Sequence, residues 1–293
     1  MQTHSSRALR AFPPAPARSS AVFAELAYLE AVHGPAFNYM YEPPAGTPWQ
    51  NCEYAQRPVR IADARARATS LSIDREGFEL LEAPSAVTDF GDEAAIRERY
   101  YPEAAELALQ VSGARQAMVF DHLVRRREAG RPALGFGREG DGSRPAAVGR
   151  VHNDYSAASG HKRLALVLPE PERLSRVRRF AIVNIWRSLR GPVLDTPLAV
   201  CDAGTVGAQD LVPAEIRYPD RNGEIYLVRH ALQHQWSYFP EMDRHEVLVF
   251  KQYDSRTDGV ARFTPHAAFD LPDIPPEAPL RESIEIRCLV VYE

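Results

Sequence analysis

The chain has 293 residues, 45% of them hydrophobic and 25% charged, which is enough apolar material for one large core or two small ones. A formal charge of −4 offers no basic field to a nucleic-acid backbone, and no apolar run approaches the roughly 20 residues that cross a bilayer. Cys52, Cys201 and Cys288 are too few and too far apart for a disulfide framework or a CxxC zinc site. We therefore expect a cytoplasmic protein with neither nucleic acid nor membrane among its partners.

The N-terminal third combines a leader with two predicted helices. Met1–Ser20 is rich in Arg, Pro, Ser and Ala and lacks the unbroken apolar stretch of a secretory signal, so we expect a disordered leader. Apolar residues at helical spacing favour a helix over Ala21–His33. A second amphipathic helix is predicted over Asp92–Gly113, with its first residue as the cap, its last as the stop, and Pro102 as a point where it kinks or splits.

Later segments alternate over short stretches between Gly, Pro and Asp turns, a pattern typical of β-strands. The predicted strands include Pro58–Ile61, Phe78–Leu81, Ala117–Phe120, Leu164–Leu168, Phe180–Trp186, Leu198–Cys201, Ile225–Val228, Trp236–Phe239, Val247–Tyr253 and Ile284–Tyr292. Among them only the charged stretch Pro169–Arg179 suits a helix, so the βαβ alternation of a parallel sheet is missing. We expect a mainly β fold over residues 21–293: a C-terminal double-stranded β-helix, or jelly roll, with flanking helices in a single domain.

The sharpest local feature is a His-x-Asp pair, His152 and Asp154, at the junction between a strand and a small-residue loop. In an extended chain this spacing puts both side chains on the same face, so both reach adjacent positions around one metal ion. Two histidines and one carboxylate on one face of an octahedron are typical of non-heme Fe(II) oxygenases. The alternative interpretation is a solvated turn in which Asn153 and Asp154 cap the backbone.

A third ligand is sought near a late strand, and two histidines compete for the role. His266 follows the strand that ends at Asp254, and its alternative is a core or loop histidine stacked on a neighbouring phenylalanine. His234 also lies beside a strand, but choosing it leaves Lys251 as the only cation to anchor a cosubstrate, and a lysine is a weaker geometric match for a carboxylate than an arginine. We therefore prefer His266.

The last strand carries a polar face. Arg281, Ser283, Glu285 and Arg287 alternate with apolar residues, so all four point to one side of an extended chain. An arginine fork binds a carboxylate through two parallel hydrogen bonds, and a serine hydroxyl two residues along donates to the same group. We predict that Arg281 and Ser283 hold the distal carboxylate of 2-oxoglutarate, with Arg287 as the reserve anchor; the alternative is a charged surface edge.

Other positions receive lesser roles. The substrate-pocket candidates are His234, Trp236, Tyr238, Tyr155 and Asn184, against the alternative that the aromatic residues are simply core. The charged positions Asp121, His122 and Arg125–Arg127 are read as a solvated face. The span Gly130–Arg144 resembles an exposed loop that acts as a lid. No GxGxxG, GxxxxGK[ST] or GxSxG motif supports a dinucleotide, phosphate or serine-nucleophile site.

From about Phe37 to the end, the chain resembles the gibberellin-desaturase-like and cephem-methoxylase group. The resemblance lies in Val151–Tyr155, Asn184–Arg187, Pro192–Ala199, His234–Pro240, Phe250–Ser255, Thr264–Phe269 and Arg281–Glu285. Two positions depart from the group: Ser237 replaces a common aromatic residue, and Ala267 replaces a usual threonine. We expect these two changes to alter the shape of the substrate pocket.

The resemblance implies an Fe(II)- and 2-oxoglutarate-dependent oxygenase, supported in vitro by ascorbate, that hydroxylates or desaturates an unactivated C–H bond of a small molecule with O2. Secondary metabolism is the implied setting. The wider taurine-dioxygenase layout, in which an arginine-bearing strand follows the distal histidine, also favours His266 over His234. The alternatives are a non-catalytic cupin-like binding protein and a zinc hydrolase that uses the same ligands. Oligomeric state stays open.

Overall fold

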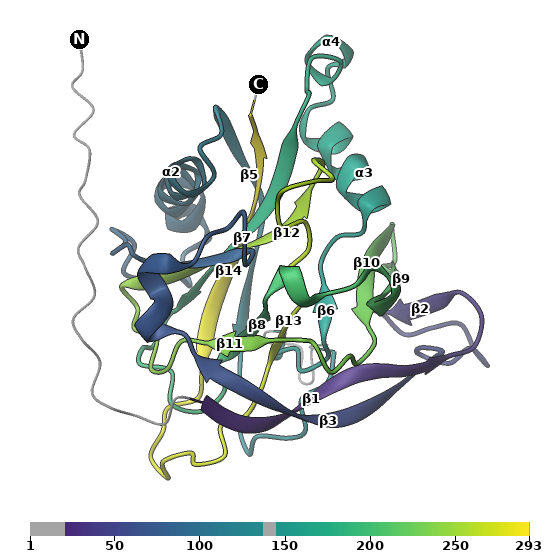
Figure 1. Cartoon of the computed structure of the whole chain (residues 1–293), viewed down its shortest axis with the longest axis vertical. Coiled ribbons are helices and arrows are strands. Elements are labelled where there is room, and N and C mark those ends of the chain that lie inside the picture. The colour runs from purple at the N-terminus through teal and green to yellow at the C-terminus, as the bar shows by residue number, and fades with distance from the viewer. Residues whose placement is uncertain (1–20, 137–144, 293) are drawn as a thin grey trace.

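The computed structural model describes residues 21–136 and 145–292, and shows two facing β-sheets with helices packed around them (Figure 1). The predicted leader, Met1–Ser20, lies outside the described residues. So does the last part of the predicted lid. Among the described residues, no helix is both long and apolar enough to span a membrane. The two facing sheets confirm the predicted mainly β, jelly-roll architecture.

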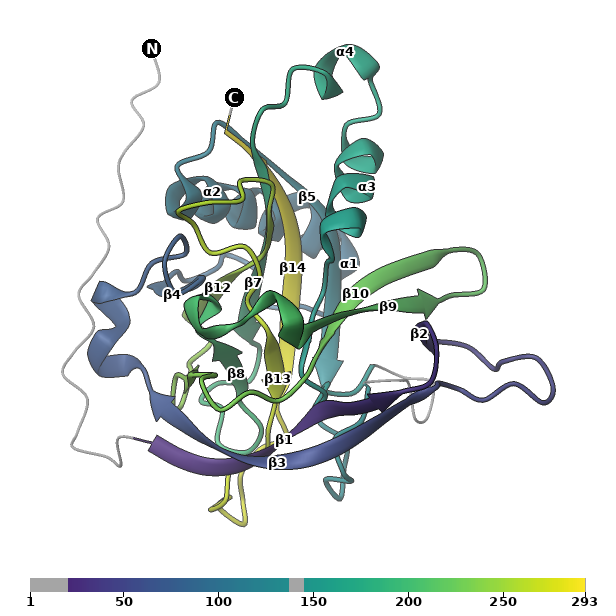
Figure 2. The ribbon, with the colours of Figure 1, turned by 45° about the vertical axis from the view of Figure 1, so that its right-hand side comes forward.

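The larger sheet has nine strands. In spatial order they are β1 (Ala21–Val32), β3 (Cys52–Asp63), β11 (Trp236–Tyr238), β8 (Leu198–Cys201), β13 (His266–Ala268), β6 (His152–Asn153), β10 (Asn222–Val228), β9 (Leu211–Arg217) and β2 (Ala36–Tyr39). Strands β1 and β3 form a long two-stranded ribbon that crosses beneath the rest of the sheet (Figure 2). The ribbon closes back onto the sheet, because the Val151 amide donates to the Ala27 carbonyl at 2.9 Å.

The smaller sheet has five strands. They are, in spatial order, β4 (Phe78–Glu82), β12 (Glu246–Asp254), β7 (Phe180–Ser188), β14 (Glu282–Val291) and β5 (Gln116–Arg126). An apolar cluster fills part of the space between the two sheets, with Phe250 and Trp186 from the smaller sheet and Val200 from the larger one. The short helices η1 (Arg65–Ser70), η3 (Ala203–Thr205) and η4 (Ala208–Asp210) lie in the connections.

The predicted helix over Ala21–His33 is wrong, because this segment is strand β1. Its residues pair with β3 from Ala21 opposite Ala62 to Val32 opposite Cys52, with one irregularity between Leu29 and Ala31. Helical spacing of apolar residues is a local signal, whereas the long antiparallel partner lies 20 residues further along and supplies hydrogen bonds along the whole strand. Tertiary pairing overrides a local propensity in this way.

The predicted helix over Asp92–Gly113 is confirmed and is split as expected. It consists of α1 (Glu93–Ala95), the π-helical turn η2 (Ile96–Tyr100) and α2 (Tyr101–Ser112). The Asp92 carboxylate accepts the Ala94 and Ala95 amides, and Gly113 ends the helix in the left-handed conformation at φ 66°. Pro102 lies in the first turn of α2, where no amide donor is needed. The apolar face of α2 covers the outer face of the smaller sheet.

The predicted strand over Leu164–Leu168 is also wrong, because most of it belongs to α3 (Ala157–Val167). Ser156 and Ser159 form a capping box that starts this helix directly after the His-x-Asp segment. Leu164 on the helix and Leu168, the residue that caps its C-terminus, pack into the apolar cluster that contains Tyr253. The neighbouring stretch Pro169–Arg179 contains the short helix α4 (Pro171–Leu174), as predicted.

Strand β14 has the two faces that its alternation predicts. Ile284, Ile286 and Cys288 pack in the cluster under α2 on the outer face. Arg287 lies on the other face, where it reaches Asp154, the residue directly after β6 of the larger sheet. The inner face of the smaller sheet is therefore polar at its centre, opposite the His-x-Asp segment.

Candidate metal and cofactor site

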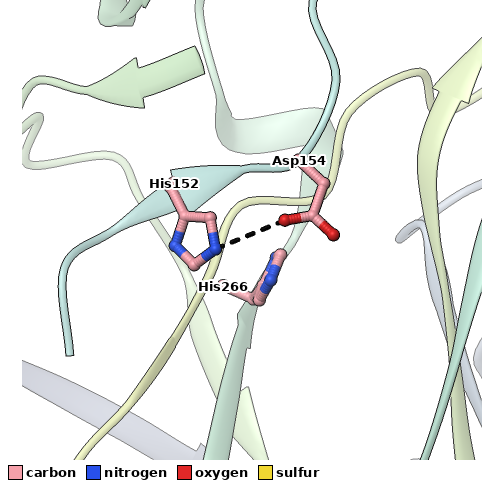
Figure 3. Close-up of side chains that lie close together, drawn as sticks. All are labelled: His152, Asp154 and His266. Atoms are coloured by element: carbon pink, nitrogen blue, oxygen red, sulfur yellow. Dashed lines mark ion pairs between the residues drawn. The ribbon is translucent and has the colours of Figure 1, made fainter. Parts of the chain in front are cut away.

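Three side chains converge between the sheets (Figure 3). His152 lies on β6 and His266 on β13, and the two residues are direct partners in the β-ladder. Asp154 follows β6 by one residue. One ligand atom from each side chain lies within 4.8 Å of the others, and the two imidazole centroids are 4.4 Å apart. The structure thus brings together the three residues predicted as metal ligands.

Backbone carbonyls fix the orientation of both imidazoles. Nδ1 of His152 donates to the Arg150 carbonyl at 2.8 Å, and Nδ1 of His266 donates to the Thr264 carbonyl at 3.3 Å. The remaining nitrogen of each ring, Nε2, is then the one without a hydrogen, which is the form that binds a metal. Nε2 of His152 lies 3.4 Å from Oδ1 of Asp154.

Burial and neighbouring charges set the protonation of the group. Burial, helped by His152, lowers the pKa of His266 to about 3. Burial alone would raise the pKa of Asp154, but the Arg287 guanidinium and the two imidazoles outweigh it and hold that pKa well below its ordinary range. At neutral pH the site therefore offers neutral His266 and an ionised carboxylate, the forms that a metal ion requires.

The Asp154 carboxylate is held from the smaller sheet. Its Oδ2 accepts from Nδ2 of Asn184 at 2.8 Å and from Nε of Arg287 at 3.0 Å. These two donors occupy one oxygen and leave Oδ1 directed at His152. Asn184, predicted as a pocket residue, is thus a direct partner of the carboxylate.

Arg287 does not match its predicted role as reserve anchor for 2-oxoglutarate. Its Nε bonds to Asp154, one terminal nitrogen bonds to Asp121 at 2.9 Å, and the other bonds to Glu285 at 3.0 Å. Each nitrogen of the guanidinium already has a carboxylate partner. The position of Arg287 directly opposite Asn184 in the ladder explains this, since both residues face Asp154.

Arg281 is the buried cation with an unfilled donor. Its side chain is 3% exposed, one terminal nitrogen donates to the Thr196 carbonyl at 3.0 Å, and its Nε has no hydrogen-bond partner among the residues that the structure describes. Burial lowers its pKa to about 10, which leaves the guanidinium charged at neutral pH. Ser283 is buried two residues further on. A buried guanidinium with a free donor suits an anion, because an unsatisfied buried charge is costly.

Arg125 lies on the inner face of the smaller sheet, as Ser283 does, although its sequence context predicted a solvated face. It lies directly opposite Ser283 in the β5–β14 ladder and therefore shares the inner face. One terminal nitrogen donates to the Ala146 carbonyl at 2.8 Å. Asp121, Leu123 and Arg125 lie two residues apart in one strand and therefore share a face. This spacing could have identified Arg125 as a residue of the inner face.

Three pocket candidates lie elsewhere. In His234 one ring nitrogen meets the Tyr28 hydroxyl at 3.1 Å and the other meets Asp210 at 3.2 Å. The indole of Trp236 donates to the same Tyr28 hydroxyl at 2.7 Å. Tyr238 packs against Phe269.

The ladder explains this placement. Ser237 pairs with Val200, which in turn pairs with His266, so these three side chains share one face of the sheet. Trp236 and Tyr238 flank Ser237 and point to the opposite face, into the cluster enclosed by the β1–β3 ribbon. The prediction that His234, Trp236 and Tyr238 line the pocket is therefore not supported.

Tyr155, the remaining pocket candidate, is buried beside the site. It packs with Leu164 and Phe180 in the cluster under α3, and its ring meets that of Phe120 edge-on at 6.4 Å between centroids. It follows Asp154 directly, but its ring belongs to the apolar packing around α3.

A jelly roll that places two histidines and a carboxylate around one point, beside a buried arginine, defines the class of non-heme iron and 2-oxoglutarate oxygenases. Residues 26–291 match the family model described as "Oxidoreductase/YMDC permease-like domain", and the chain belongs to this family. The family assignment covers both sheets and all three side chains of the triad.

Named relatives agree with this class. The chain is 35% identical over 264 residues to the hydroxylase/desaturase CTB9 of Cercospora beticola, covering 82% of this chain and 78% of the relative. It is 33% identical over 242 residues to the alpha-ketoglutarate-dependent dioxygenase phiK of a fungal species, covering 80% and 84%. Among solved structures, the iron and alpha-ketoglutarate-dependent endoperoxidase NvfI superimposes with a TM-score of 0.82 at 27% identity, covering 93% and 98%.

The protein is thus a 2-oxoglutarate-dependent dioxygenase that uses Fe(II), O2 and a small-molecule substrate. The relatives are named as enzymes, which favours a catalyst over the alternative of a non-catalytic binding protein. Their names include iron and alpha-ketoglutarate, which favours an iron oxygenase over the alternative of a zinc hydrolase.

Proposed function

We propose that His152, Asp154 and His266 hold the Fe(II), and that Arg281 and Ser283 bind the distal carboxylate of 2-oxoglutarate. The observation that supports this assignment is the convergence of the three ligand atoms within 4.8 Å inside the barrel. The Arg281 guanidinium lies on the same inner wall, 5.8 Å from the centre of the Trp186 ring. The site therefore offers a metal position and an anion position on facing sheets.

The residues around the metal position have separate tasks. Asn184 and Arg287 hold one oxygen of Asp154, so the other oxygen keeps a fixed direction toward the metal position. The carbonyls of Arg150 and Thr264 hold the two imidazoles. When bound, Fe(II) and 2-oxoglutarate supply the oxidation of a C–H bond by O2, with release of succinate and CO2. The barrel orients the C–H bond and excludes water.

We infer hydroxylation or desaturation of an unactivated C–H bond in a small molecule of secondary metabolism. The inference rests on the name of the relative from Cercospora beticola, a hydroxylase/desaturase, and on the resemblance of the motifs to a group acting on such compounds. Ser237 faces inward on the same face as His266, with Val200 of β8 between them, and its side chain fills less space there than an aromatic residue would. We propose that this added space serves the organic substrate.

The test is anaerobic addition of Fe(II) and 2-oxoglutarate to the metal-free protein. A weak visible charge-transfer band is expected if the keto acid binds to Fe(II) that the three residues would hold. The His152→Ala variant should lose the band. A folded wild-type protein without the band would contradict the proposal.

We further propose that residues 21–293 form one domain that works in the cytoplasm, without nucleic-acid partners. The larger sheet provides the triad, the smaller sheet provides the partners of Asp154, and both share a core, which supports one domain. Cys52, Cys201 and Cys288 are all buried and free, which suits a reducing compartment. Fractionation of cells expressing the tagged chain tests the location, and limited proteolysis tests the domain.

A further inference from the structure

One buried amide side chain contacts both metal-binding segments. Gln252 lies on β12 at the irregularity in its pairing with β7, where Lys251 pairs with Val183 and Tyr253 pairs with Ile182. Gln252 is the extra residue between them, as in a β-bulge, a feature that re-aims side chains. It has no solvent-exposed surface.

The two ends of this amide serve different segments. Its Oε1 accepts the Asp154 backbone amide at 2.7 Å. Its Nε2 donates to the Thr264 carbonyl at 3.1 Å, the same carbonyl that orients His266. Gln252 thereby joins the carboxylate ligand to the distal histidine through one rigid group.

Asn153 supplies a second amide in the same place. Its Oδ1 accepts the Thr264 backbone amide at 3.0 Å, and its Nδ2 donates to the carbonyls of Gln252 at 2.8 Å and Tyr155 at 2.7 Å. Asn153 is also fully buried. The two amides and the segments that they join form a closed hydrogen-bonded unit, which we call the amide bridge.

The β-ladder alone does not fix this geometry. β13 and β6 share a single residue pair, His266 opposite His152, and Asp154 lies beyond the end of β6. The segment around Asp154 therefore needs contacts outside the ladder. The amide bridge supplies them, with Asn153 on β6 and Gln252 on β12 of the opposite sheet.

We propose that Gln252, with Asn153, is a positioning residue that sets the separation and direction of Asp154 and His266 before the metal binds. This inference rests on the proposed metal ligands. Gln252 reaches the metal position through the Asp154 amide, the Thr264 carbonyl and a 3.5 Å contact between its Nε2 and Nδ1 of His266. It therefore acts on metal affinity and on the spectrum without being a ligand. Outer-shell changes of this kind typically weaken metal binding about 10–100-fold.

Titration of metal-free protein with Mn(II), followed by calorimetry, tests the proposal. Gln252→Met keeps the length of the side chain but removes its hydrogen bonds, among them those to the Asp154 amide and the Thr264 carbonyl. We expect Mn(II) to bind about 10–100-fold more weakly. Gln252→Glu keeps the acceptor for the Asp154 amide and loses the donor to Thr264, so we expect an intermediate loss. In both variants the visible band of the Fe(II) and 2-oxoglutarate chelate should shift.

Asn51 provides a matched control. Its side chain also bonds three backbone groups, the His33 and Pro35 carbonyls and the Phe37 amide, in a part of the chain that contributes nothing to the triad. Asn51→Ala should lower the melting temperature and leave Mn(II) affinity and the visible band unchanged.

Wild-type affinity and an unshifted band in a folded Gln252→Met variant would overturn the proposal. If that variant does not fold, the same result in Gln252→Glu overturns it equally. A loss of Mn(II) affinity in Asn51→Ala as large as in Gln252→Met would also overturn it, because the effect would then follow general stability. The proposed ligands are tested separately: Mn(II) binding that survives His152→Ala contradicts them, whatever Gln252 does.

Discussion

Two histidine clusters lie on opposite faces of the large sheet, and they differ in how their nitrogens are used. In the first, His152 and His266 each meet a backbone carbonyl through Nδ1, and their other nitrogens lie near Asp154. In the second, His234 is bonded on both nitrogens, to Tyr28 and to Asp210.

The comparison shows that a histidine near a carboxylate is not enough for a metal site. Both clusters contain that pair in a buried setting. Only the first leaves imidazole nitrogens directed at a common point, because its second partners are carbonyls on one side of each ring. A buried histidine whose two nitrogens are both bonded to side chains packs as part of a core.

The largest expected difference between the clusters is metal content. His266→Ala removes one of the three proposed ligands, so iron measured after anaerobic reconstitution and desalting should fall to background. His234→Ala should keep near-stoichiometric iron, since its ring points into the opposite face of the sheet. Retained iron in the first variant with loss in the second would reverse the assignment.

Cosubstrate affinity is the next largest effect. Arg281→Met removes the buried guanidinium, and truncating one partner of a buried charged pair costs about 2–5 kcal/mol, so 2-oxoglutarate should bind at least about 30-fold more weakly. Anaerobic titration of the visible band measures this. Arg190→Met is the control, because Arg190 pairs with Glu282 next in sequence to Arg281 but is about half exposed. If both variants bound 2-oxoglutarate equally weakly, the loss of affinity would come from the general surface charge and not from Arg281 itself.

The pH dependence of the metal-free protein gives a smaller effect, which concerns His266 of the first cluster. The pKa of His266 is lowered to about 3 in the folded state, against about 6.5 in the unfolded chain. The unfolded chain therefore binds a proton that the folded protein does not, and stability falls as the pH drops from about 6.5 toward 3, by up to about 1.4 kcal/mol per pH unit.

Urea unfolding at pH 7 and pH 5 measures this contribution. Wild type should lose about 2 kcal/mol more than His266→Leu over that interval. The lowered pKa of Asp154 has the same sign, but it acts below the ordinary carboxyl range and so lies outside this interval. Equal losses in the two proteins would show that His266 does not carry the effect.

The smallest effect concerns the second cluster. Tyr28→Phe removes the hydroxyl shared by Trp236 and His234, and leaving buried groups unsatisfied costs about 1–3 kcal/mol. Thermal or urea unfolding should show that loss, with iron content and 2-oxoglutarate affinity unchanged. The partly buried Tyr41 offers a control substitution to Phe. Loss of iron in Tyr28→Phe would mean that the two faces of the sheet are coupled.

The predictable parts of the molecule follow from short-range periodicity. Alternation within one extended segment predicts that His152 and Asp154 share a face, and it also predicts the polar and apolar faces of β14. The role of Gln252 depends on an irregularity in the pairing of β12, and no local pattern reveals such an irregularity.

Two segments show where local periodicity fails. The strand at Ala21–Val32 depends on a partner 20 residues away, so its helical spacing misled the prediction. The helix at Ala157–Val167 is set by a serine capping box that the sequence analysis read as a loop.

Strand β14 has a consequence for the order in which the protein is completed. It is the last strand of the described chain, yet it lies in the interior of the small sheet between β7 and β5. A chain emerging from the ribosome without residues 282–291 leaves both neighbouring strands with an open edge, and their pairing waits for contacts that are distant in sequence. Because Arg281 and Arg287 arrive with that strand, the proposed metal and anion positions gain these two arginines only once residues 282–291 have paired with both neighbours.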